Sequence, residues 1–147
     1  MGNSHYKLMK VKIDSQTALP GAFKDLANLT SYAVINLNDI NYDDFNSQVN
    51  ILFKAKSITG YKKRALTGED IPLYSENWNN YLLQIYDVRE FHQKIKDENL
   101  TQFSVLFGIK IHDRKIYLCS IEEDAGITLV ELSITVNTYK IQLQQCN

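Results

Sequence analysis

The sequence contains few of the residues that usually mark a catalytic or cofactor-binding site. Its 147 residues include only two cysteines, three histidines and six glycines. The glycines form neither the GxGxxG nor the Walker pattern of phosphate-binding loops, and the histidines and cysteines show no metal-ligand spacing. We therefore predict no cofactor, no metal site and two free thiols, Cys119 and Cys146, in a reducing compartment.

The sequence also lacks an excess of charge of one sign and long apolar runs. With 16 basic and 17 acidic residues its formal net charge is −1, so no global attraction to nucleic acid or to an anionic membrane is expected. No apolar run reaches the roughly 18 residues of a transmembrane helix, and the N-terminus has no apolar core of a signal peptide. These absences predict a cytoplasmic protein that does not associate with a membrane.

The residues that are present fit one ordinary domain. Hydrophobic residues make up 44% of the sequence, and a chain of this length buries roughly two-thirds of its surface on folding. We interpret residues 1–147 as a single domain in which residues 1–5 are flexible.

The first half of the chain predicts strands and helices in alternation. Residues 6–13 alternate as a half-buried strand, residues 22–29 suit a short helix, and residues 31–37 are rich in the β-branched and aromatic residues of a strand. Asn41 is a good N-cap, and apolar residues at helical spacing follow it, so a helix is predicted over 41–57. Residues 61–74 lose all periodicity and predict a long connecting loop.

The segment 75–95 has two interpretations. Its apolar residues step at three or four positions, which favours one long helix capped by Ser75. Alternatively, residues 81–86 form a strand, and Asp87 and Glu90 form the capping box of a shorter helix that ends at Ile95. We favour the single helix because the apolar stripe passes through Asp87 without a change of period.

Residues 101–136 predict an antiparallel meander. A turn at Asp113 and Arg114 pairs Ile111 with Ile116, Ile109 with Leu118 and Phe107 with Ser120, and this register places the odd-numbered residues 103–111 on one apolar face. A second turn over 122–126 pairs Val130 with Leu118 and Leu132 with Ile116, which gives the same apolar face. A last strand is predicted over 139–143.

Together these elements predict an α+β domain. Their order is β-α-β-α-α-β-β-β-β, with the helices packed on one face of a largely antiparallel sheet.

The clustered acids of the second meander turn suggest a binding function. Because no catalytic motif is present, we favour a cytosolic protein-binding module over an enzyme, possible types being an inhibitor or an immunity protein that blocks a partner with a basic surface. Acids on a rigid hairpin turn would steer such a partner. The predicted partner-binding residues are Glu122, Glu123, Asp124, Tyr117 and Glu131.

Two alternatives belong to other functional classes. The first is a small enzyme or ligand-binding domain whose pocket lies between the sheet and the 61–74 loop. The second is nucleic-acid binding through the basic segment 54–64, where lysines would follow a phosphate backbone and a tyrosine would stack on a base. The residues of this basic patch are Tyr61, Lys62, Lys63 and Arg64.

Overall fold

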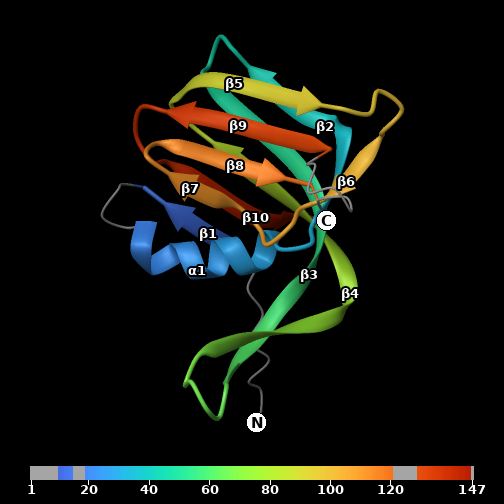
Figure 1. Ribbon diagram of the computed structural model, residues 1–147. Coiled ribbons are helices and arrows are strands. Elements are labelled where there is room, and N and C mark those ends of the chain that lie inside the picture. Colours follow the sequence, from blue (N-terminus) through green and yellow to red (C-terminus); the bar gives the residue numbers. More distant parts are fainter. Residues whose placement is uncertain (1–9, 15–18, 121–128, 147) are drawn as a thin grey trace.

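The computed structural model describes residues 10–14, 19–120 and 129–146. In this part of the chain it shows one helix and ten strands (Figure 1). Their bounds are β1 Lys10–Ile13, α1 Leu19–Thr30, β2 Val34–Asp43, β3 Gln48–Lys63, β4 Asp70–Ile85, β5 Val88–Ile95, β6 Gln102–Ser104, β7 Lys110–His112, β8 Lys115–Cys119, β9 Val130–Val136 and β10 Ile141–Cys146.

The strands form two antiparallel sheets that share one hydrophobic core. The larger sheet has the order β1-β10-β4-β3-β2-β6, and the smaller sheet has the order β5-β9-β8-β7. The smaller sheet lies in front of the larger one in Figure 1, and α1 lies beside β1 at one end of the two sheets. Buried residues of both sheets and of α1 belong to a single cluster, so the architecture is a β-sandwich with one helix at its end.

The inner face of the larger sheet is built from aligned rows of aliphatic residues. Ile13 pairs with Ile141, which pairs with Ile85, and this residue pairs in turn with Val49. All four are fully or almost fully buried. Alternation of these residues with polar ones gives each strand one face for the core and one for solvent.

The predicted helix over 41–57 is wrong. This segment forms the end of β2, a turn over 44–47 and the first part of β3. Within β3 the buried residues Val49, Ile51 and Phe53 alternate with exposed or half-buried ones, whereas Phe45, which belonged to the helical stripe, is 96% exposed in the turn. Val49 and Ile51 are β-branched, which favours a strand, and β3 pairs with β2 on one side and β4 on the other. Both factors favour the alternation of a strand over the spacing of a helix.

The predicted helix over 75–95 is also wrong. Residues 75–85 continue β4, and Val88–Ile95 is β5. The strand interpretation of residues 81–86 is therefore confirmed through Ile85, but Asp87 caps no helix, because its φ of 56° places it in the left-handed region of a tight connection. Without these two helices, the predicted α+β arrangement with helices on one face of a sheet is replaced by two packed sheets.

Other parts of the prediction are confirmed. The helix over 22–29 is the core of α1, and the strands predicted near the ends of the chain correspond to β1 and β10. The turn at Asp113 and Arg114 has both residues at positive φ, and Ile111 pairs with Ile116 as expected. In the next pair of strands Leu118 faces Leu132 rather than Val130, a slip of two residues that keeps the same side chains in the core.

The end of β3, the start of β4 and the turn between them extend past α1, away from both sheets (Figure 1). We call this hairpin, residues 59–73, the arm. Tyr61 on the arm donates a hydrogen bond to the carboxylate of Asp25 on α1. Lys24 of α1 lies 3.1 Å from the carboxylate of Asp70 on the arm. The segment predicted as a loop over 61–74 is thus largely a hairpin held against the helix.

Candidate binding surfaces

Two exposed aromatic residues lie side by side where α1 ends. The ring centroids of Tyr32 and Phe107 are 6.5 Å apart in an edge-to-face arrangement. Tyr32 is 52% exposed and Phe107 is 65% exposed. Both have left-handed backbone conformations, with φ of 59° and 58°, which are rare for bulky side chains and are found where the surrounding structure imposes them.

Hydrogen bonds between the two loops hold this pair in place. The Tyr32 amide donates to the Val105 carbonyl at 2.7 Å. The Ile109 amide donates to the Thr30 hydroxyl at 2.8 Å, and that hydroxyl donates to the carbonyl of Leu26. The loop that carries Phe107 is therefore fixed to the last turn of α1, and the two rings are positioned before any partner binds.

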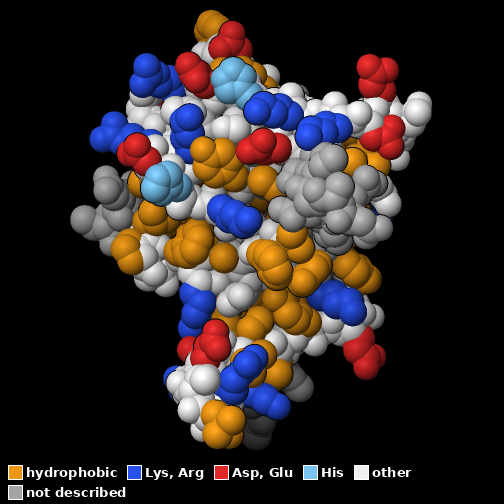
Figure 2. Space-filling model, in the orientation of Figure 1, with side chains coloured by type: hydrophobic (Ala, Val, Ile, Leu, Met, Phe, Trp, Pro, Cys, Tyr) orange, Lys and Arg blue, Asp and Glu red, His pale blue; other side chains and the backbone are white. Residues whose placement is uncertain are grey.

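Next to this pair lies a groove with aromatic walls. Its volume is about 230 Å³, and hydrophobic side chains gather on this side of the molecule in Figure 2, near the end of α1 and the start of the arm. Trp78 is 51% exposed and Tyr74 is 41% exposed. We call this hollow the aromatic groove; it is lined by Ser31, Tyr32, Lys56, Tyr74 and Trp78.

The polar side-chain groups of the aromatic groove are the Lys56 ammonium and the Trp78 indole N–H, which only donate hydrogen bonds, and three hydroxyls, which can donate or accept them. The Lys56 ammonium lies over the ring of Trp78, 5.6 Å from its centroid. Tyr74 donates its hydroxyl hydrogen to the Asn28 carbonyl at 2.9 Å, and burial, followed by the nearby Tyr32, raises its pKa above the usual value. Tyr74 therefore stays neutral at physiological pH, and its ring is fixed as one wall of the groove.

Sequence patterns did not identify this surface. The helical spacing over residues 75–95 predicts Trp78 in the apolar stripe of a helix, and the meander register predicts Phe107 on the core face; both predictions are wrong, since Trp78 and Phe107 are exposed. In the structure Val105, not Phe107, is paired with Ser120, because Phe107 and Gly108 both turn into the left-handed region. A glycine inside an alternating strand is a signal of such a bulge, so Gly108 was the available clue.

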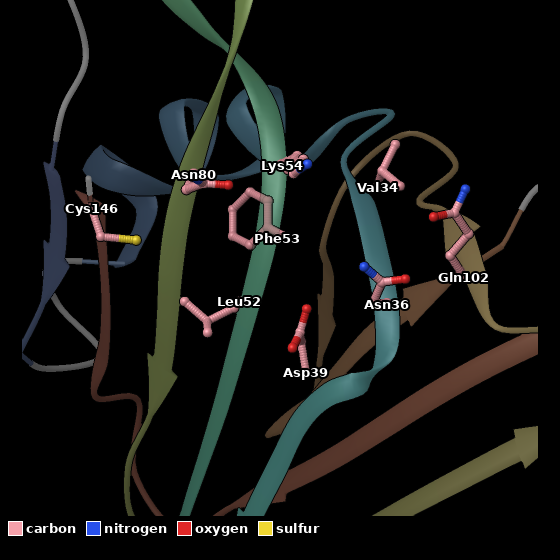
Figure 3. A pocket seen from close by; sticks show the side chains of 9 residues that line it. All are labelled: Val34, Asn36, Asp39, Leu52, Phe53, Lys54, Asn80, Gln102 and Cys146. Carbon is pink, nitrogen blue, oxygen red and sulfur yellow. The ribbon is translucent and has the colours of Figure 1, made fainter.

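A second hollow, of about 310 Å³, lies on the outer face of the larger sheet (Figure 3). It forms where β2 bulges away from β3. Ile35 pairs with Phe53 and Ile40 pairs with Ile51, so residues 36–39 of β2 lie opposite Leu52 alone. Asp39 projects from this bulge into the hollow. We call it the polar hollow; its lining residues are Val34, Asn36, Asp39, Leu52, Phe53, Lys54, Asn80, Gln102 and Cys146.

Of the predicted partner-binding residues, Glu122, Glu123 and Asp124 lie outside the described residues. Tyr117 and Glu131 are half-buried on the outer face of the smaller sheet. They line a shallow hollow together with His92, Lys94, Lys115 and Ser133. Glu131 is paired with Lys94 across β5 and β9, and it is the one acid among the lining residues, which also include Lys115.

The predicted basic patch is divided among separate contacts. Tyr61 is bonded to Asp25, as described above, and the Lys63 ammonium lies 3.0 Å from the carboxylate of Asp70. Lys62 and Arg64 are exposed near the tip of the arm. Farther along β3, Lys54 lines the polar hollow and Lys56 lines the aromatic groove. Of the predicted loop 61–74, only Tyr74 lines the aromatic groove.

The carboxylates with lowered pKa values have structural partners. A hydrogen bond from Thr138, and then one from Asn137, lowers the pKa of Asp87. Contacts with Asn46 lower the pKa of Asp43 in the turn after β2. Within residues 10–14, 19–120 and 129–146, no group of three His, Cys, Asp or Glu side chains is placed to hold a metal ion.

Two further observations concern the chain as a whole. Among the described residues, no helix has both the length and the apolar character needed to cross a membrane. Comparison of the chain with protein-family models, with curated proteins and with solved structures finds no match.

Proposed function

We propose that this protein is a protein-binding module and that the aromatic groove, together with Phe107, is its main contact surface. The observation that supports the proposal most directly is the pair of exposed aromatic residues, Tyr32 and Phe107, held in left-handed backbone on two loops that are bonded to each other. Exposed apolar patches on soluble proteins mark interaction sites more often than isolated apolar residues do.

The composition of the surface supports the same function. Tyrosine and tryptophan contribute most to binding energy at protein interfaces, because they bury a large area with few rotatable bonds. Residues that are already fixed in position lose little conformational entropy on binding. The hydrogen bonds from the Ile109 amide to the Thr30 hydroxyl and from the Tyr32 amide to the Val105 carbonyl provide this preorganisation.

The acidic cluster is a separate part of the proposal. Glu122, Glu123 and Asp124 remain the predicted contact for a basic surface of the partner, and an inhibitor or immunity-type role in the cytoplasm follows only if that contact exists. Charges at the edge of an interface mainly change the association rate, while buried aromatic residues mainly change the dissociation rate. The two surfaces therefore make different, measurable contributions to the same complex.

The test is an affinity capture with the wild-type chain and a patch variant. Tyr32→Asn combined with Phe107→Asn removes both rings, and asparagine tolerates the left-handed backbone of both positions. The matched control is Phe45→Asn combined with Leu66→Asn, since these residues are 96% and 97% exposed and line neither hollow. We expect the wild type and the control to recover the same partners, and we expect the patch variant, Tyr32→Asn with Phe107→Asn, to lose them.

The opposite pattern would contradict the proposal. If the patch variant, shown by circular dichroism to be folded, retains the same partners with unchanged affinity, the aromatic surface is not the contact. Loss in the control variant alone would place the contact at the hairpin tips instead.

A ligand-binding role is the second candidate, and the polar hollow is the observation that favours it. There an acid, a base and three amide side chains surround an apolar floor that includes Leu52. Asp39 and Lys54 have no ion-pair partner among the residues that the structure describes. A small zwitterion matches this pair of charges, and Asp39→Asn would abolish the binding of such a compound measured by calorimetry.

A further inference from the structure

We infer that the aromatic groove binds an extended, proline-rich segment of the partner that carries a carboxylate next to its prolines. This inference rests on the proposed function and specifies the kind of partner. It is drawn from the shape of the groove, from the hydrogen-bonding character of its walls and from the position of Lys56.

The walls match proline rings in shape and polarity. Tyr32, Tyr74 and Trp78 come from two separate segments and surround one open hollow. Grooves lined by aromatic residues take up polyproline II segments, because the proline rings pack flat against them and the segment is already extended before it binds. Such a ligand adds little entropic cost to a surface that is itself fixed.

The free hydrogen-bond donors of the aromatic groove favour a ligand with many hydrogen-bond acceptors. The Tyr32 hydroxyl and the Trp78 indole nitrogen have no hydrogen-bond partner among the described residues. No carboxylate lines the groove. A polyproline II segment offers free backbone carbonyls and, at each proline, no N–H group that would need an acceptor.

Lys56 adds a requirement for negative charge. Its ammonium contacts the Trp78 ring and forms no ion pair with any described acid. A carboxylate in the ligand would therefore meet an unpaired cation at the edge of an apolar groove. This charge complementarity distinguishes an acidic proline-rich segment from a basic one.

Nucleic acid fits the aromatic groove less well. Bases stack on tyrosine and tryptophan, but a single-stranded nucleic acid also needs a row of cations along its backbone. Lys56 is the one cation among the residues that line the groove. The experiments below therefore include a single-stranded oligonucleotide as an alternative ligand.

The first experiment probes an array of proline-rich peptides with the full chain. The peptides share a Pro-x-x-Pro core, and the intervening and flanking positions vary over acidic, basic and neutral residues. Matched peptides carry alanine in place of both prolines. We expect the wild-type chain to retain proline-containing peptides with aspartate or glutamate, and the Tyr32→Asn variant to retain none of them.

The second experiment uses the only tryptophan of the chain, Trp78, as a probe of the groove. Its side chain is half-exposed, so covering it shifts the fluorescence emission to shorter wavelength. We expect a saturable shift with an acidic peptide from the array, and at least about a tenfold weaker affinity for the Lys56→Glu variant, about 1.4 kcal/mol of binding energy. Lys56→Glu should also gain affinity for the matched basic peptide.

Control variants and alternative ligands decide the outcome. Lys62→Glu reverses an exposed charge of the same strand outside the aromatic groove, and it should leave the acidic peptide bound as in the wild type. Retention of peptides without a preference for proline, or of none, would overturn the inference. A stronger, salt-sensitive shift with a single-stranded oligonucleotide would overturn it in favour of nucleic acid.

The two proposals can fail separately. If captured partners depend on Tyr32 and Phe107 but no proline-rich peptide binds, the protein-binding function stands and the class of ligand is wrong. If peptides bind at Trp78 but capture is unaffected by the patch variant, the function proposed for the surface is wrong.

Discussion

Gly108 lies directly against the backbone of Ala27. A Cβ atom built on Gly108 would come within 2.1 Å of the Ala27 carbonyl oxygen, and the φ of Gly108 is +78°. This close approach brings the loop that carries Phe107 into contact with the last turn of α1. The position of an exposed aromatic residue therefore depends on the absence of a side chain at its neighbour.

The first prediction follows from this contact. Gly108→Ala must shift the backbone and also adopt an unfavourable φ, so we expect a loss of about 2 kcal/mol or more in the free energy of unfolding. Gly21→Ala in the first turn of α1 is the control, because its Cβ would meet nothing within 4 Å. That variant should be neutral or more stable by up to about 1 kcal/mol. Urea titration followed by circular dichroism measures both changes.

The second prediction concerns a buried hydrogen bond between β3 and β4. The hydroxyls of Ser57 and Tyr81 are 2.6 Å apart, and both residues are fully buried. Ser57→Ala removes this partner of Tyr81 and also the acceptor of the Asn79 side-chain amide, and we expect a cost of about 1–3 kcal/mol. A double-mutant cycle with Tyr81→Phe should give a coupling energy of at least about 0.5 kcal/mol. Strictly additive effects would show that the two hydroxyls do not interact.

The third prediction is a pH dependence of the arm. A hydrogen bond from Lys63, and then one from Lys24, lowers the pKa of the Asp70 carboxyl. Because the folded-state pKa is depressed, the stabilisation is complete above the unfolded value of about 3.9 and is lost as the pH falls through the lower folded value. Amide exchange in residues 59–73, corrected for its intrinsic pH dependence, should accelerate in that range.

Two variants check the origin of this effect. Asp70→Asn should show faster exchange in the arm already at neutral pH, with no further acceleration on acidification. Glu69→Gln, which changes an exposed neighbour on the same hairpin, should behave like the wild type. An unchanged arm in Asp70→Asn would mean that the contacts of Tyr61 and Tyr74 suffice to hold it.

The fourth prediction addresses the acidic cluster. Reversal of Glu122, Glu123 and Asp124 to lysine should slow association with a basic partner about tenfold or more at low salt. Reversal of Asp97 and Glu98, two exposed acids of the connection between β5 and β6, is the control and should have a smaller effect. Surface plasmon resonance measures the association rates of the wild type, the cluster variant and the control variant. Equal rates for all three would show that the acidic cluster does not take part in the interface.

The contrast between the two halves of the chain shows what periodicity can and cannot predict. In β8 and β9 aliphatic residues occupy every second position and are buried, so a register wrong by two positions still assigns Leu118, Leu132 and Ile134 to the core. In β3 the residues Val49, Leu52 and Phe53 also satisfy a helical spacing. Leu52 is in fact 44% exposed on the outer face of the sheet, and its exposure depends on the neighbouring strands, which no local pattern records.

The binding surface was harder to predict for a related reason. Trp78, Tyr32 and Phe107 come from three distant segments, and each lies within an apolar pattern that suits a core residue. Each reaches the surface in a different way. Trp78 lies on the outer face of β4, Tyr32 follows the end of α1, and Phe107 and Gly108 interrupt the meander in left-handed backbone. Such irregularities depend on tertiary contacts such as the one between Gly108 and Ala27.

The pairing of β1 with β10 has a consequence for the order in which the chain folds. Lys10 pairs with Gln144 and Ile13 pairs with Ile141, so the first strand that the structure describes finds its place only after the last one has been synthesised. Pairings between such distant segments are slow to form, because the loop between them must close first. During translation Val11 and Ile13 of β1 therefore lack their neighbours on β10 until residues 141–146 have been synthesised, and α1 is the nearer element that can contact β1 before then.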